Sequence, residues 1–66
     1  MDIGERIKYN RDRNAMTQQE LADCIYTSRA NISYWETGIR IPKVNHLVRL
    51  CRAFDITPNN FLGWVE

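Results

Sequence analysis

The residues of this chain with the most usable chemistry lie in the segment 28–43, where hydrogen-bonding and basic side chains follow one another closely. Arg29 has a guanidinium group that suits the O6 and N7 acceptors of guanine, and a phosphate contact is its competing use. Ala30 could rest against a thymine methyl group, and Tyr34 offers both a ring and a hydroxyl. The polar side chains nearby, which could bond bases or phosphates, are Ser28, Asn31 and Ser33. The segment therefore has the chemistry to contact double-stranded DNA.

Positive charge accompanies these side chains. Arg40 and Lys43 follow them directly, where a cation would approach the phosphate backbone of the same DNA segment. Residues 28–52 contain five basic residues and one acidic residue, whereas residues 1–27 contain four basic and five acidic ones. The net charge of the chain is only +1, so the distribution of charge is more informative than its sum. For each of these polar side chains, the alternative is ordinary contact with water.

The sequence contains few residues that could form a metal site or a catalytic site. His46 is the only histidine, so there is no cluster of histidines and cysteines for a metal and no catalytic triad. Cys24 and Cys51 lie 27 positions apart, and we expect both to be reduced, with Cys51 in the core and Cys24 on a helix surface. No carboxylate pair is singled out by its spacing, and there is no glycine-rich phosphate loop. We predict a binding module with no enzymatic activity, metal or cofactor, in which His46 is a surface residue.

Length and composition favour a single folded domain. A chain of 66 residues buries about 60% of its unfolded surface and cannot enclose a large catalytic pocket. Hydrophobic residues make up 44% of the chain and charged residues 26%, as in an ordinary globular protein. Charged residues interrupt the first ten positions, and no apolar run approaches the length of a membrane span. We expect one domain over residues 1–66 and a cytoplasmic location.

Capping residues and periodicity predict an all-α fold of about five helices, because no segment alternates as a strand would. Thr17 and Glu20 form a capping box, so one helix begins at Gln18. Ser28 caps the next helix, and Gly38 ends it. The expected helices cover about residues 3–13, 18–25, 29–37, 44–54 and 58–62.

Residues 17–38 have the layout of a helix-turn-helix, with two short helices joined by a tight turn. Tyr26 occupies the turn position, where the left-handed conformation favours glycine, and we expect its strain to be about 1 kcal/mol. The residues that should face inward from the two helices are Leu21, Ala22, Ile25, Ile32 and Trp35. The polar residues opposite Ile32 and Trp35 then face outward.

Taken together, the chain resembles the phage repressor and Cro-like family of helix-turn-helix transcriptional regulators, also called the xenobiotic-response-element type. The matching residues are Ile3-Gly4-Glu5-Arg6-Ile7 with Arg11, Thr17-Gln18-Gln19-Glu20-Leu21-Ala22, Ser28-Arg29, Ile32-Ser33, Trp35-Glu36, Gly38, Pro42, Leu47, Leu50 and Phe61-Leu62-Gly63. The resemblance implies a compact, lambda-repressor-like domain of five helices that regulates transcription, typically as a repressor occupying operator DNA. Three residues depart from the family pattern, namely Asn10, Tyr26 and Thr27.

The resemblance also implies roles for three residues that do not belong to the outward face of the expected helix 29–37, which is the recognition helix of the family. Gln18 matches a glutamine that contacts a phosphate, and the N–H groups and dipole at a helix start favour an anion there. Arg11 and Glu36 match residues that meet as an ion pair between the first and third helices. Such a pair would orient the recognition helix rather than contact DNA. The alternative is two independent surface charges.

The C-terminal residues Phe61, Trp64 and Val65 form a larger apolar group than a short last helix needs. They either close the core or form a dimer surface. A two-fold homodimer, formed in solution or only on DNA, would place two recognition helices about 34–36 Å apart on a palindromic operator. A Cro-like regulator that is encoded by a phage or a bacterium and associates with the nucleoid fits these features. Its own concentration or a protein partner would control it. The alternative function is a protein-interaction module, such as an antitoxin that holds a toxin with the same fold.

Overall fold

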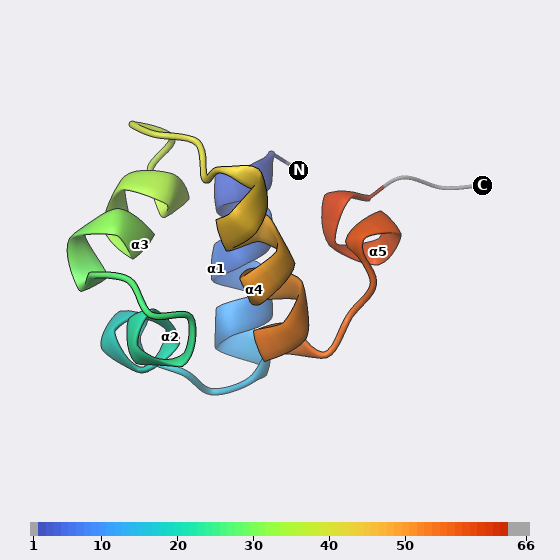
Figure 1. Ribbon diagram of the computed structural model, residues 1–66, viewed down its shortest axis with the longest axis horizontal. Coiled ribbons are helices and arrows are strands. Elements are labelled where there is room, and N and C mark those ends of the chain that lie inside the picture. Colours follow the sequence, from blue (N-terminus) through green and yellow to red (C-terminus); the bar gives the residue numbers. More distant parts are fainter. Residues whose placement is uncertain (1, 64–66) are drawn as a thin grey trace.

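Five helices make up the regular structure of the described residues, 2–63, in the computed structural model (Figure 1). They are α1 (Ile3–Arg13), α2 (Gln18–Cys24), α3 (Arg29–Glu36), α4 (Val44–Phe54) and α5 (Pro58–Leu62). These residues contain no strand, which confirms the predicted all-α, five-helix fold. Within the same range, no helix combines the length and the apolar character that crossing a membrane requires. Trp64 and Val65 of the expected dimer surface lie outside the described residues.

Local capping explains why the helices start where they do. In the predicted box at α2, Thr17 Oγ1 accepts the Glu20 N–H at 3.0 Å and Glu20 Oε1 accepts the Thr17 N–H at 2.9 Å. Asp2 and Glu5 form a second box at α1, at 2.8 and 3.2 Å, which the sequence analysis did not predict. Side-chain oxygens also cap α3 and α5, whereas α4 begins after Lys43 without such a bond.

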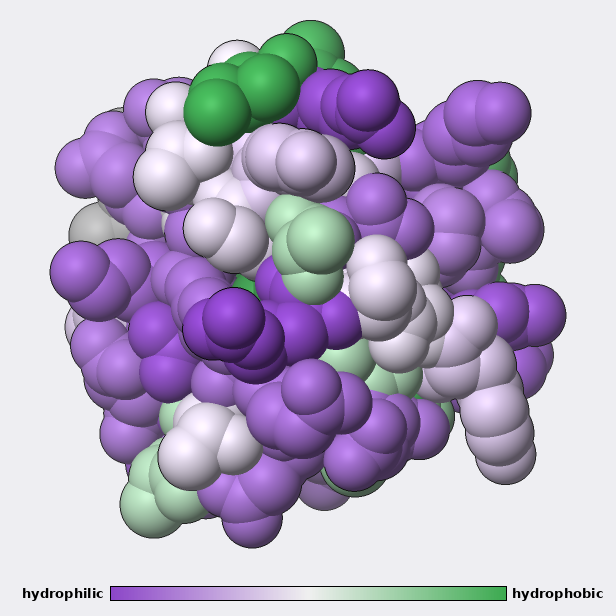
Figure 2. Space-filling view, turned by 90° about the vertical axis from the view of Figure 1, so that its left-hand side faces the viewer, coloured by the Kyte–Doolittle hydropathy of each residue, from purple (hydrophilic) through white to green (hydrophobic). Residues whose placement is uncertain are grey.

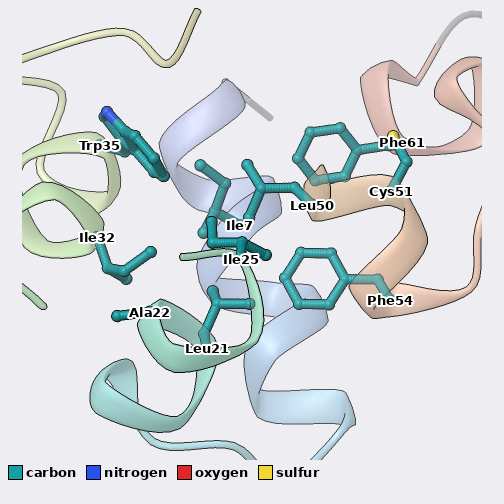
Figure 3. Close-up of a cluster of buried hydrophobic side chains, with 10 residues drawn as sticks. All are labelled: Ile7, Leu21, Ala22, Ile25, Ile32, Trp35, Leu50, Cys51, Phe54 and Phe61. Carbon is teal, nitrogen blue, oxygen red and sulfur yellow. The ribbon is translucent and has the colours of Figure 1, made fainter. Parts of the chain in front are cut away.

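The core gathers side chains from all five helices around α1, which packs against α3, α4 and α5 (Figures 1 and 3). All five residues predicted to face inward from the helix-turn-helix are buried. Ala22 is fully buried, and its small side chain lets α2 and α3 pack closely. Phe61 is only 1% exposed and its ring lies 6.0 Å from that of Phe54. Phe61 therefore closes the core, and its burial removes it from the expected dimer surface.

The turn between α2 and α3 accommodates a tyrosine in place of glycine. Tyr26 has φ of 60°, the left-handed conformation expected for this position. The next residue, Thr27, donates its N–H to the Ala22 carbonyl at 3.0 Å, so the turn keeps its backbone hydrogen bond. Arg49 of α4 donates to the Ile25 carbonyl at 3.3 Å, and its guanidinium lies 5.8 Å from the centre of the Tyr26 ring. Contacts with α4 thus support the strained residue.

The backbones of α1 and α3 approach each other most closely at Gly4. A Cβ atom at this position would overlap the Trp35 carbonyl oxygen and lie 2.9 Å from the Glu36 carbonyl oxygen. Farther along α1, Asn10 is 7% exposed at a position where the family pattern has leucine. Its Nδ2 donates to the Arg6 carbonyl at 2.8 Å, so this buried amide is satisfied within its own helix. The departure at Asn10 is thus accommodated by a hydrogen bond within α1.

His46 is not the plain surface residue that the sequence predicted. It is partly buried, and its ring lies 4.9 Å from the ring of Trp35. The reason is that α4 begins directly beside the C-terminal half of α3, which the helical pattern of α4 alone does not specify. The two cysteines follow expectation, with Cys24 exposed and Cys51 buried. Burial raises the pKa of the Cys51 thiol, so it remains protonated near neutral pH.

Candidate nucleic-acid interface

Two buried side chains determine which side of α3 faces solvent. Ile32 and Trp35 anchor the helix to the core, so the opposite side lies on the surface (Figure 3). Arg29 and Ala30 are exposed on that side, and Ser33 and Tyr34 are partly exposed. Figure 2 shows that the face carrying α2 and α3 is mainly hydrophilic. The structure therefore brings the predicted DNA-contacting residues of α3 onto one accessible surface.

The side chains at the start of α3 are held by one another. Ser28 Oγ accepts the Asn31 N–H at 3.2 Å, so this hydroxyl caps the helix. Asn31 Nδ2 donates to Thr27 Oγ1 at 2.8 Å, and a second N–H and the Oδ1 atom of the Asn31 amide remain to bind other groups. The sequence analysis treated Thr27 only as a departure from the family pattern. The spacing of four residues between Thr27 and Asn31 was the signal that such a bond could form.

Arg40 is attached to the recognition helix by two contacts. Its backbone N–H donates to the Tyr34 carbonyl at 3.2 Å, and its guanidinium carbon lies 4.8 Å from the centre of the Tyr34 ring. Lys43 is exposed at the end of the same loop. A hollow of about 250 Å³ lies beside α3, and it is lined by Asn31, Trp35, Arg40, Ile41, Lys43 and His46. The two predicted phosphate-binding cations thus lie next to the outward face of α3.

A polar cluster of three residues fixes α3 from the inner side; we call Arg11, Gln18 and Glu36 the inner cluster. Arg11 Nε donates to Glu36 Oε2 at 2.7 Å, and a second guanidinium nitrogen donates to Glu36 Oε1 at 3.2 Å. The side chains of Glu36 and Arg11 are only 5% and 13% exposed. The hydrogen bond that Arg11 donates to Glu36 raises the pKa of Arg11 above its ordinary value. The structure thus contains the ion pair that the family resemblance implied.

Gln18 belongs to the same cluster, which the sequence did not predict. Its Nε2 donates to Glu36 Oε1 at 3.2 Å. An amide has a second N–H and a carbonyl oxygen, so this bond still leaves groups for a phosphate at the start of α2. Glu36 is the only acidic residue of α3, and the inner cluster turns it away from the surface. The outward face of α3 therefore carries no carboxylate of its own to repel DNA.

Comparison with known proteins identifies the family. A family model described as helix-turn-helix matches residues 7–61. The chain belongs to the helix-turn-helix family. Its backbone superimposes with a TM-score of 0.87 on the P22 c2 repressor in complex with a synthetic operator, at 29% identity over 94% of both chains. The helix-turn-helix fold and the pairing of α2 with α3 thus agree with a solved repressor.

Two curated relatives show how the domain occurs in longer proteins. The chain is 32% identical to the HTH-type transcriptional activator BcrR of Enterococcus faecalis over all of its own length and 32% of that protein. It is 42% identical to the competence pilus inhibition repressor of Acinetobacter baylyi over 83% of its own length and 50% of that protein. The chain therefore spans 32% to 50% of the length of these two relatives.

Proposed function

We propose that residues 1–66 form a sequence-specific unit that binds double-stranded operator DNA and regulates transcription, most simply as a repressor that excludes polymerase. The observation that carries this proposal is the outward face of α3, which presents polar side chains and no carboxylate beside the cations Arg40 and Lys43. An α-helix of this kind fits the major groove. The site binds rather than catalyses, and it acts in the cytoplasm on phage or bacterial DNA.

Three kinds of contact follow from where the side chains lie. Arg29, exposed at the first turn of α3, reads a guanine edge. Arg40 and Lys43 bind phosphates of the strand that passes the α3–α4 loop, and Gln18 binds a phosphate from the start of α2. The remaining contacts of the recognition helix, to bases or phosphates, come from Ser28, Ala30, Asn31, Ser33 and Tyr34.

Selection of duplexes from a random DNA pool, followed by binding measurements across salt concentrations, tests the proposal. We expect one enriched palindromic sequence and an affinity that falls steeply with salt, because phosphate contacts release counterions. Arg29→Ala should relax the base preference at one position of each half-site and weaken binding by about 5- to 150-fold. Lys43→Ala should weaken binding to all sequences alike and lower the salt slope by about 1.

Arg52→Ala is the matched control for these charge deletions. Arg52 lies in the last turn of α4 and lines a hollow between α4 and α5, away from α3. Its removal should leave base preference and salt slope unchanged. If no duplex is enriched and the salt dependence is shallow, the DNA-binding proposal is wrong and the protein-interaction alternative replaces it.

A further inference from the structure

The side chain of Asn31 is held at the start of α3 by residues that precede the helix. Its backbone N–H donates to Ser28 Oγ at 3.2 Å, and its Nδ2 donates to Thr27 Oγ1 at 2.8 Å. Thr27 and Asn31 are both partly exposed, so the bond between their side chains lies at the surface rather than in the core. We call these two residues the amide pair. The pair presents an ordered polar group in the same turn of α3 as the exposed residues Arg29 and Ala30.

The hydrogen bond of the amide pair contributes little to the fold itself. Ser28 rather than Thr27 caps α3, and Ile32 and Trp35 anchor this helix to the core. A hydrogen bond between two partly exposed side chains adds little stability, because water replaces it when the chain unfolds. The bond instead selects one of the two ways in which a planar amide can be turned. The free edge of the Asn31 amide is therefore presented to solvent in one orientation.

The free edge of this amide carries one donor and one acceptor. They are the second Nδ2 N–H and the Oδ1 atom, because the first N–H is donated to Thr27. In the major groove, adenine presents its N7 acceptor beside its N6 donor, which matches this edge with two hydrogen bonds. Guanine presents two acceptors, N7 and O6, and one of them would oppose Oδ1. An amide turned the other way would present two N–H groups and would suit guanine instead.

We propose that Thr27 is a positioning residue that sets the Asn31 amide to read an adenine in each operator half-site. This inference rests on the proposed DNA-binding function and deepens it, because it assigns a base to one side chain of α3. Thr27 acts through Asn31 and makes no base contact of its own. Side chains two positions apart do not share a face of a helix, so Asn31 and Arg29 meet different base pairs.

Base preference at a single position measures the role of Asn31. The probes are the duplex selected by the wild-type chain and the same duplex with the proposed A·T pair replaced by G·C in both half-sites. We expect wild type to bind the replaced duplex about 5- to 150-fold more weakly per half-site, the usual cost of losing a bidentate contact. Asn31→Ala should bind the two duplexes with similar affinity and should keep the preference of Arg29 for guanine.

Thr27→Val measures the positioning role, because valine has the shape of threonine without the hydroxyl that accepts the amide N–H. We expect the preference for adenine to fall by about 3- to 10-fold, while affinity for the replaced duplex stays within about 2-fold of wild type. Thr27→Ser keeps the hydroxyl and should restore the full preference. A change that acted only on the stability of the fold would weaken binding to both duplexes alike.

Thr37→Val is the matched control at the other end of α3. The Thr37 hydroxyl donates to the Ser33 carbonyl at 2.8 Å, so this variant also removes a hydrogen-bonded threonine hydroxyl from the helix. It should leave the preference for adenine unchanged. Circular dichroism of each variant checks that the helical fold is retained.

Three results would overturn the inference while the proposed function stands. One is an Asn31-dependent preference for guanine, which requires the opposite orientation of the amide. The second is an equal loss of affinity for both duplexes in Asn31→Ala, which indicates a phosphate contact. The third is an undiminished preference for adenine in Thr27→Val. Failure to enrich any duplex from a random pool would instead overturn the proposed function itself, and this inference with it.

Discussion

The inner cluster and the exposed aliphatic residues Ile39, Ile41 and Val44, which we call the apolar rim, lie near the same end of α3 and reverse the usual distribution of side chains. Arg11 and Glu36 of the inner cluster are charged yet almost completely buried. Ile41 and Val44 of the rim are aliphatic yet exposed. The buried charges are tolerated because each is hydrogen-bonded to another element. The comparison teaches that buried, hydrogen-bonded charges fix the inner side of α3, whereas the aliphatic side chains that follow its C-terminal end remain exposed to solvent.

Breaking the inner cluster should have the largest effect. Glu36→Gln removes the buried charge that faces Arg11 and leaves the guanidinium with only an exposed acidic neighbour, so we expect the free energy of unfolding to fall by about 3 kcal/mol. Asp12→Asn is the control, since Asp12 contacts the same arginine at 3.5 Å from an exposed position. It should change stability by less than about 0.5 kcal/mol. Urea denaturation measures the free energy of unfolding of both variants. Equal small losses would show that the buried ion pair stabilises the fold no more than the exposed contact with Asp12 does.

Gly4→Ala tests whether close backbone contact also fixes the inner side of α3. The added methyl group would collide with the carbonyl oxygens of Trp35 and Glu36 and force α1 and α3 apart. We expect a loss of about 2 kcal/mol in the free energy of unfolding. Gly38→Ala separates collision from backbone strain, because Gly38 has φ of 80° and no atom near its Cβ position. Its cost should be only about 1 kcal/mol.

Substitutions in the apolar rim should hardly change the free energy of unfolding. Ile41→Ser and Val44→Ser remove aliphatic groups that are already in water, so the free energy of unfolding should change by no more than about 0.5 kcal/mol. Thermal denaturation of the free chain measures this. A loss of unfolding free energy comparable to that of Glu36→Gln would mean that the rim side chains stabilise the fold. The contrast between the two regions would then disappear.

The smallest effect concerns the capping box of α2, which positions Gln18 of the inner cluster. The backbone N–H of Thr17 and then its side chain lower the pKa of Glu20 below the ordinary carboxyl value. A lowered pKa means that the stabilisation is present above the ordinary value and is lost as the pH falls through the lowered one. Between pH 6 and pH 3, wild type should therefore lose slightly more stability than Glu20→Gln. Parallel stability curves for the two chains would contradict this.

The sequence determined the helices because the signals that start and end them are local. Thr17, Ser28 and Thr57 cap the N–H groups within three residues of themselves, and the buried stripe of each helix follows from its own spacing. The outward position of Arg29 and Ala30 follows from the same spacing once Ile32 and Trp35 are buried. The fold and the face of the recognition helix could thus be predicted without any long-range contact.

Only the tertiary structure decided how the elements use their remaining side chains. Gln18 and Glu36 lie 18 positions apart, and no local pattern specifies the hydrogen bond between them. The sequence left two roles open for Phe61, closure of the core or a dimer surface. The packing of α5 makes it a core residue. The tertiary structure also left Ile41 and Val44 largely exposed. The physical reason is that capping and periodicity act within a few residues, whereas burial depends on which elements meet in space.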